Sequence, residues 1–479
     1  MSREFKNFIN GEWLAGSETF TNINPSELNK PVGESYFANT GMVKDAISGA
    51  VEAGQKWALT GIEQRSDILM KIGEQLMQRK NELGELIAIE EGKTLKEGIG
   101  EIDRAARFFY YYAGEALRII GDFTDSVRPN VGIEVSRSPL GCVLVVTPWN
   151  FPVALPAWKI APALAYGNSV IFKPSEHTPA SACELMKIMH EAGVPAGTVQ
   201  LVLGEGKTIG MELLQSEQID GVSFTGSVAT GKKIAMESAK LMKKFQLEMG
   251  GKNALIVMDD CNLEEAVQSA LGGAFFGTGQ KCTASSRIIV AEGIYNQFLE
   301  KFVDAAKSVK VGHALSPDSV IGPCVNKEQF QKNESYMKLA LDENAKIAYQ
   351  SPSVKFPENG YYFGPVIFTD THNKMRINRE EMFGPMTCLI KAKNYEEALE
   401  LCNDTEFGLT AGIMTSSLKH ATHFKRNAQA GCVMVNLPTA GTDYHVPFGG
   451  TKSSSYGPRE QGSYAAEFYT RVKTAYIKA

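Results

Sequence analysis

The chain has 479 residues, of which 43% are hydrophobic and 22% are charged, a composition that predicts a globular protein of two or three domains. Its formal net charge of −5 argues against nucleic acid as a partner, because a phosphate-binding surface needs an excess or a stripe of basic residues. The N-terminal residues 1–13 carry charges at positions 3, 4, 6 and 12 and no continuous apolar run, so we predict no secretory signal and a cytoplasmic location.

Helices are expected across residues 42–120. Between residues 68 and 87, apolar side chains recur at helical spacing with charged residues between them, which is typical of helices that bury one face. We interpret this region as scaffold.

A small β arm is predicted next. Residues 132–136 alternate apolar and polar side chains, which indicates a hairpin that leaves the main body before Gly141. The tail, residues 465–477, has a similar content of aromatic and β-branched residues. Because exposed strand edges are usually covered, we expect this arm to pair with another subunit in a homodimer or homotetramer.

Residues 142–158 contain no charged residue and nearly reach the length of a membrane span. The prolines at positions 148, 152 and 156 would leave backbone groups without partners in lipid. We therefore predict a buried strand followed by a helix, and no membrane partner.

Parallel strands joined by helices are predicted from residue 141 onward. Runs rich in β-branched residues alternate with helical segments, at residues 143–147, 169–173, 199–203, 221–225 and 245–248. After the second run, Thr178 is expected to cap a helix, Pro179 to start it and Gly193 to end it. Ligands of such open sheets bind beyond the carboxyl ends of the strands, so we expect site loops at residues 148–150, 173–176, 226–227 and 248–250.

A second α/β unit follows Asn262, which is expected to cap a helix over residues 263–276. A glycine-rich segment and a strand at residues 287–291 come next. Further helices are expected at residues 294–309, 395–403 and 418–427, and a strand at residues 432–436.

The chain has eight cysteines, and no two form the C-x-x-C pattern of metal or redox sites, so no metal site is predicted. Most are expected to be reduced space-fillers. Cys282 differs because it follows Gly277, Gly279 and Gln280 at a helix-to-strand junction, where a thiol can be presented to a cleft. As a nucleophile it would need a base or N–H dipoles to form its thiolate; as one more buried cysteine it would need neither.

Two further side chains at strand ends have both a catalytic and a structural interpretation. Glu248 closes a strand in an apolar setting, which would raise its pKa and make it a base near neutral pH; otherwise it is a paired or solvent-facing carboxylate. Asn150 follows the first β-branched run, where its amide either donates to a developing oxyanion or shapes the turn.

Residues 226–233 come close to the phosphate loop of nucleotide hydrolases, but Lys233 stands where a Ser or Thr would hold magnesium. This disfavours a nucleotide hydrolase. Gly226, Ser227 and the start of the following helix still suit a pyrophosphate group, because helix N-termini attract anions.

Seven motifs resemble, in order, those of the aldehyde dehydrogenase superfamily over essentially the whole chain. They lie at residues 148–152, 172–176, 224–227, 247–252, 279–282, 381–385 and 447–450. The resemblance implies an α/β fold with a Rossmann-like doubly wound coenzyme domain, a second α/β catalytic domain and a small β oligomerisation arm with a tail. The implied bounds are residues 1–120 and 141–247 for the first, 248–448 for the second, and 121–140 and 449–479 for the arm and tail.

The resemblance also implies the reaction. Cys282 attacks the carbon of a small-molecule aldehyde, and the Asn150 amide and the Cys282 backbone N–H stabilise the oxyanion. Hydride passes to NAD or NADP, and Glu248 activates the water that hydrolyses the thioester to the acid. Relatives that pass the acyl group to coenzyme A commonly lack this glutamate, so hydrolysis is favoured.

Cofactor-binding residues are implied in the same way. The set is Trp149, Lys173, Ser175, Glu176, Gly226, Ser227, Gly250, Glu381 and Phe383. Lys173 and Glu176 would contact the adenosine ribose, Trp149 and Ser227 the pyrophosphate, and Glu381 with Phe383 the nicotinamide ribose. Glu176 would repel a 2′-phosphate and favour NAD, whereas Lys173 beside Ser175 would accept NADP, so both cofactors stay open.

The tail points to a substrate. Residues 449–474 look like those of bacterial α-ketoglutaric semialdehyde (2,5-dioxopentanoate) dehydrogenases, which implies oxidation of that anion to 2-oxoglutarate. Another semialdehyde or an aliphatic aldehyde is the alternative substrate. Lys281, next to the nucleophile, is either an anchor for an anionic substrate or a solvated lysine. A catalytically silent binding protein with this fold is the alternative of another class, which the retention of Cys282, Glu248 and Asn150 argues against.

Overall fold

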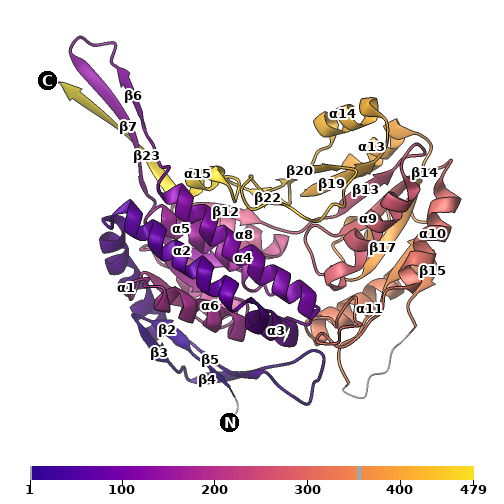
Figure 1. Cartoon of the computed structure of the whole chain (residues 1–479), viewed down its shortest axis with the longest axis horizontal. Helices are drawn as coiled ribbons and strands as arrows, with labels where there is room; N and C mark the ends of the chain where they lie inside the picture. Colours follow the sequence, from indigo (N-terminus) through magenta and orange to yellow (C-terminus); the bar gives the residue numbers. More distant parts are fainter. Residues whose placement is uncertain (1–2, 353–358, 479) are drawn as a thin grey trace.

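An eight-stranded sheet forms one half of the molecule (Figure 1). The structure is a computed structural model that describes residues 3–352 and 359–478. Across the sheet, the strands are β22 (Ser455–Tyr456), β12 (Lys244–Glu248), β11 (Gly221–Thr225), β8 (Cys142–Val146), β9 (Ser169–Lys173), β10 (Val199–Leu201), β2 (Asn7–Ile9) and β3 (Glu12–Leu14). The central strands, β12 to β10, run parallel. The edge strands β22, β2 and β3 are antiparallel to their neighbours.

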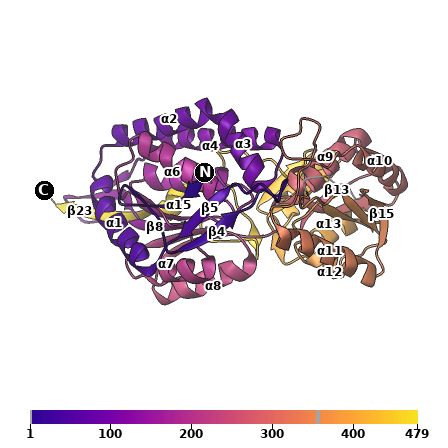
Figure 2. The same cartoon turned by 90° about the horizontal axis from the view of Figure 1, so that it is seen from below.

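Helices cover both faces of this sheet, as Figure 2 shows. Val143 and Val145 of β8 pack into one core and Leu144 into another, because successive side chains of a strand point to opposite faces. The first core is covered by α2 (Ile62–Gln78), α3 (Lys80–Glu91), α4 (Leu95–Ala116), α5 (Ala154–Ala165) and α6 (Pro179–Glu191). The second is covered by α1 (Thr40–Ala58), α7 (Met211–Gln215) and α8 (Val228–Lys240). This is the doubly wound arrangement that the resemblance implies.

Helix α6 begins at Pro179 and is followed by Gly193 with a φ of 105°, as predicted, but the predicted cap is wrong. The Thr178 side chain makes no cap hydrogen bond. Instead, the carboxylate of Glu90, from α3, accepts hydrogen bonds from the backbone N–H groups of Ala180 (2.7 Å) and Ser181 (2.9 Å). A residue distant in sequence therefore satisfies the donors that the threonine was expected to satisfy.

A seven-stranded sheet forms the other half and is parallel except at one edge. Its strands are, in order, β15 (Lys346–Gln350), β16 (Val366–Thr369), β17 (Met386–Ala392), β14 (Ser285–Ala291), β13 (Asn253–Val257), β19 (Thr410–Met414) and β20 (Cys432–Val435). Its helices are α9 (Leu263–Phe275), α10 (Tyr295–Lys307), α11 (Lys327–Asp342), α12 (Arg376–Arg379), α13 (Tyr395–Asn403) and α14 (Leu418–Asn427). Asn262 caps α9 by accepting from the N–H of Glu265, as predicted.

Three strands form an arm that projects from the first half (Figure 1). The long strand β7 (Val131–Pro139) pairs with β6 (Asp122–Asp125) on one side and with β23 (Thr470–Lys478) on the other. The predicted hairpin and the predicted strand of the tail thus pair within one chain, after a short helix, α15 (Ala466–Tyr469). Within the described residues, the outer edges of β6 and β23 pair with no further strand.

Two smaller sheets were not predicted. One has the order β1 (Glu4–Phe5), β5 (Gly33–Phe37), β4 (Glu18–Asn22), and the other pairs β18 (Phe407–Gly408) with β21 (Thr451–Lys452).

The residue bounds of the domains stay a prediction. Among the helices of residues 3–352 and 359–478, none combines the length and the hydropathy that a membrane span requires.

Candidate active site

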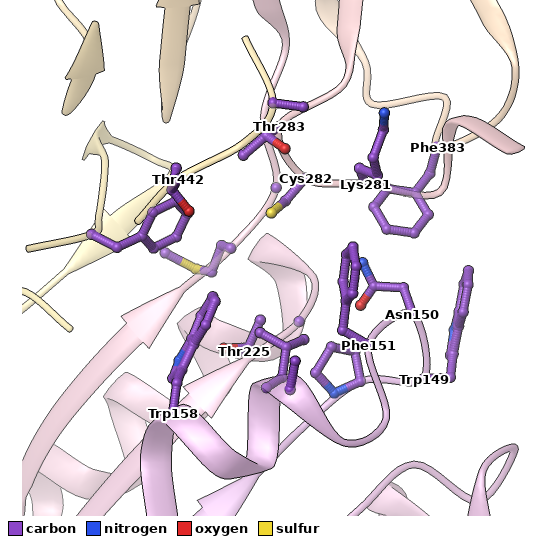
Figure 3. Close-up of a pocket in the computed structure, with 18 of the residues that line it drawn as sticks. Trp149, Asn150, Phe151, Trp158, Thr225, Lys281, Cys282, Thr283, Phe383 and Thr442 are labelled. Carbon is purple, nitrogen blue, oxygen red and sulfur yellow. The ribbon is translucent and has the colours of Figure 1, made fainter. Parts of the chain in front are cut away.

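A cavity of about 520 Å³ lies where the carboxyl ends of β8, β11 and β12 meet loops of the second half (Figure 3). The loops after these three strands form much of its wall, as expected for an open α/β sheet. The predicted residues that line it are Trp149, Asn150, Gly226, Ser227, Gly250, Cys282, Glu381 and Phe383. Those predicted residues that are absent from its wall are Lys173, Ser175, Glu176 and Glu248.

Cys282 reaches this cavity through a tight left-handed turn. After α9, residues Gly277, Thr278 and Gly279 all have positive φ, between 55° and 65°. A Cβ atom on Gly279 would lie 2.1 Å from the carbonyl oxygen of Gly384, so only glycine fits there. The side chain of Asn253 then holds the Cys282 carbonyl with a 2.7 Å hydrogen bond.

The surroundings of Cys282 favour the neutral thiol. Burial, and to a smaller extent the charges of Glu381 and Glu248, raise the pKa of Cys282 to about 12. The side chain is half-buried and lines the cavity. Nucleophilic attack therefore requires a group that removes the thiol proton.

Asn150 lies beside Cys282 in the cavity (Figure 3). Its Nδ2 atom donates to the carbonyl oxygen of Gln280 at 3.0 Å, which uses one of its two N–H groups and leaves the other for a ligand. Its backbone carbonyl accepts a 2.7 Å hydrogen bond from the buried Nζ of Lys93, which also pairs with Glu101 at 2.6 Å. The loop that carries this amide is thus fixed by a buried ion pair.

Glu248 is buried but turned away from the cavity. Its Oε2 atom accepts a 2.6 Å hydrogen bond from the hydroxyl of Ser455 in β22. Burial, and then the neighbouring carboxylate of Glu460, raise the pKa of Glu248 well above its usual range. Glu460 pairs with the buried amine of Lys159. Glu248 has to rotate before it can act on a group bound in the cavity.

The residues predicted at the nicotinamide side contact one another and their neighbours. The rings of Trp149 and Phe383 meet edge to face with centroids 5.5 Å apart. Glu381 accepts a 3.0 Å hydrogen bond from the N–H of Gly251. Gln329, which the sequence analysis missed, lines the cavity and donates to the carbonyl of Phe383 at 2.9 Å.

The residues of this wall fit a dinucleotide. The hydroxyl of Thr225 is buried, has no hydrogen-bond partner and lies on the cavity wall, so it is available to a polar ligand. Ser227 caps α8 through the N–H of Thr230 at 3.2 Å, and the first turn of α8 presents further N–H groups.

The three residues predicted at the adenosine side lie at the carboxyl end of β9, outside the cavity wall. The Lys173 amine donates to the carbonyl of Pro174 at 2.9 Å and lies 3.6 Å from the Glu176 carboxylate. Burial lowers the pKa of Lys173, and Glu176 opposes this effect. The Ser175 hydroxyl accepts from the N–H of His177.

The other end of the cavity was not predicted. Its wall is mostly apolar and includes Arg104, Phe108, Trp158, Thr442 and Phe448. The spacing of Arg104 and Phe108 places them on one face of α4, but that spacing does not say what the face meets. Lys281 is not the solvated lysine considered above: its amine donates to the carbonyl of Gly272 at 2.9 Å and points away from the Cys282 sulfur (Figure 3).

Comparisons with known proteins agree with one another. The model of the aldehyde dehydrogenase family matches residues 13–475. The chain is 41% identical to the alpha-ketoglutaric semialdehyde dehydrogenase of Bacillus subtilis (strain 168), over 99% of this chain and 98% of that protein. It is 38% identical to the alpha-ketoglutarate semialdehyde dehydrogenase of Haloferax volcanii, over 99% of each. A crystal structure of betaine aldehyde dehydrogenase from Staphylococcus aureus in complex with NAD+ matches with a TM-score of 0.96 at 33% identity, over 99% of this chain and 95% of that one.

Proposed function

The chain belongs to the aldehyde dehydrogenase family, and on this basis we propose that it oxidises α-ketoglutaric semialdehyde (2,5-dioxopentanoate) to 2-oxoglutarate. The general activity is the oxidation of an aldehyde to a carboxylic acid with NAD or NADP. The observation that carries the choice of substrate is similarity over nearly the full length of two relatives that are named for it.

The proposed catalytic residues are Cys282, Asn150 and Glu248. The Cys282 sulfur, after its proton has passed to a solvent water molecule, bonds to the aldehyde carbon, while the remaining N–H of the Asn150 amide and the backbone N–H of Cys282 donate to the oxyanion. NAD(P), when bound, would supply the acceptor for the hydride of this carbon, and the acyl group then stays on the Cys282 sulfur as a thioester. Glu248 rotates from Ser455 and takes the proton of the water that hydrolyses this thioester.

The proposed cofactor residues fall into two groups. Trp149, Gly226, Ser227, Gly250, Glu381 and Phe383 line the cavity and would hold the nicotinamide and pyrophosphate parts. Lys173, Ser175 and Glu176 would hold the adenosine ribose. In the Lys173–Glu176 pair, the carboxylate disfavours a 2′-phosphate and the amine favours it, so this pair sets the ratio of NAD to NADP use.

We also propose that the arm makes a homodimer or homotetramer. Three side chains of β23 are apolar and exposed, Val472 (61%), Tyr476 (60%) and Ile477 (51%), and one edge of the strand pairs with no other strand among the described residues. The cytoplasmic location stays a prediction.

A panel of aldehydes tests the proposed substrate. We expect kcat/KM to be highest for α-ketoglutaric semialdehyde, and about tenfold or more above that of pentanal, which has the same chain length without the charge. Succinic semialdehyde and betaine aldehyde test shorter and cationic substrates, and each is measured with NAD and with NADP. A higher kcat/KM for pentanal or betaine aldehyde would refute the proposed substrate while leaving aldehyde oxidation in place.

A further inference from the structure

Arg104, on α4, carries a half-buried positive charge in the same cavity as Cys282. The side chains around it at this end, Phe108, Trp158 and Phe448, are aromatic, so the guanidinium is the charged group of an otherwise apolar wall. A guanidinium presents several N–H donors in a plane, which matches the two oxygens of a carboxylate. We propose that Arg104 binds the remote carboxylate of the substrate and selects acidic aldehydes, an inference that rests on the function proposed above.

The guanidinium has no strong partner of its own. Its nearest contacts are a long hydrogen bond to the Thr442 hydroxyl, 3.5 Å, and the ring faces of Phe108 and Tyr444, 5.3 and 5.8 Å from its central carbon. Within the described residues, no carboxylate forms an ion pair with Arg104. Asp443 is near enough to favour its charge, but that residue is exposed to solvent. The site is therefore open to an anion from solution.

Nearby carboxylates on α4 are already engaged. Arg104 also borders a second cavity of about 260 Å³, which Glu97 and Glu101 line. Glu101 pairs with Lys93 at 2.6 Å and accepts from the N–H groups of Val153 and Ala154. Glu97 accepts a 2.7 Å hydrogen bond from the N–H of Gly277. Neither carboxylate neutralises Arg104, and burial with no ion-pair partner lowers the pKa of its guanidinium.

The other cations of the cavity wall are less suited to this role. The Lys281 amine is directed to the carbonyl of Gly272, and burial lowers its pKa to about 8. Lys332, on α11, lies near Glu381 and Glu380, whose charges favour its protonated form, on the side of the cavity assigned to the nicotinamide. Arg104 is the cation at the aromatic end of the cavity whose wall also includes Cys282.

Substitution of Arg104 tests the inference through substrate preference. For α-ketoglutaric semialdehyde, we expect Arg104→Gln to lower kcat/KM by about 10- to 100-fold, mainly through KM, because a charge-assisted hydrogen bond is lost. The decrease in kcat/KM for pentanal should be about tenfold smaller. The ratio of kcat/KM for α-ketoglutaric semialdehyde to that for pentanal therefore falls in this variant. Arg104→Lys keeps the positive charge but lacks the planar guanidinium that can donate to both carboxylate oxygens, so it should give an intermediate ratio.

The matched control is Arg107→Gln on the same helix. Arg107 is exposed and pairs with Asp103 at 2.6 Å, outside the cavity wall, so this variant should keep the wild-type ratio. A second readout is competitive inhibition by glutarate, a carboxylate without an aldehyde, whose inhibition constant should rise in Arg104→Gln and not in Arg107→Gln.

Two results would count against the inference, and they differ from failure of the proposed function. An equal loss for semialdehyde and pentanal in Arg104→Gln, with unchanged glutarate inhibition, would make Arg104 a structural residue in an enzyme that still prefers the semialdehyde. A wild-type enzyme that prefers pentanal would instead refute the proposed substrate, and the selection of acidic aldehydes with it.

Discussion

The thiol of Cys282 faces a cavity with Glu381 in its wall, and the charges of Glu381 and of the nearby Glu248, which lies outside the wall, oppose its ionisation. With a pKa raised to about 12, the thiol is mostly protonated at neutral pH. The free thiol is therefore protected from adventitious oxidation and alkylation, which both require the thiolate.

We predict that the reactivity of Cys282 in the cofactor-free enzyme keeps rising with pH. The rate of alkylation by iodoacetamide should increase about tenfold per pH unit between about pH 7 and pH 10, because the thiolate fraction does so below the pKa. Mass spectrometry of the peptide that contains Cys282 measures the rate, and Cys282→Ala provides the blank. A plateau near about pH 8.5, the range of an unperturbed thiol, would contradict the raised pKa.

A second prediction concerns Glu248. Glu248→Gln keeps an acceptor for the Ser455 hydroxyl but removes the base, so we expect one burst of NAD(P)H per active site, then a steady rate about 100-fold or more below wild type. Rapid-mixing absorbance measures burst and steady rate together. Cys282→Ala should show no burst, since no thioester forms. Wild-type steady turnover in Glu248→Gln would remove the base assignment.

At the scale of an element, the start of α6 depends on a side chain of α3. Glu90 is buried and its two oxygens accept hydrogen bonds from Ala180, Ser181 and Asn22. The hydroxyl of Thr178 is also buried, yet it has no partner. These hydrogen bonds join α3 to the first turn of α6, where Thr178 was expected to cap the helix.

We predict that Glu90→Gln loosens the first turn of α6, because an amide replaces one acceptor oxygen and leaves a backbone donor unsatisfied. The free energy of local opening should fall by about 1–3 kcal/mol. Hydrogen exchange of the peptide that starts at Pro179 measures this. Thr178→Val, which removes a hydroxyl without a partner, should cause no such loss; equal loosening in both variants would restore the threonine as the cap.

At the scale of the molecule, the arm carries the remaining prediction. If β23 joins subunits, placing charges there by Val472→Asp with Tyr476→Asp should convert the proposed dimer or tetramer to a smaller species. Light scattering gives the mass. Leu418→Asp, at an exposed position of α14 (81%), is the control that should keep the native mass. A monomeric wild type, or an unchanged mass in the double variant, would refute the arm as an interface.

The sequence by itself determined the repeating elements and the loops at their ends. The strands expected at residues 169–173 and 221–225 coincide with β9 and β11, and Asn262 caps α9 as expected. These features could be predicted because hydrophobic period, capping residues and glycine positions act within a few residues of the chain. Local signals left Cys282 and Asn150 with both a catalytic and a structural interpretation, and the family resemblance singled them out; the structure places both on one cavity.

Only the tertiary structure decided which side chains from distant parts of the sequence come into contact. Arg104 faces the cavity, Glu248 turns to Ser455 from the tail, and Glu90 replaces Thr178 at α6. Each depends on a partner far away in sequence, and side-chain direction follows from how helices and sheets pack, which local periodicity does not specify.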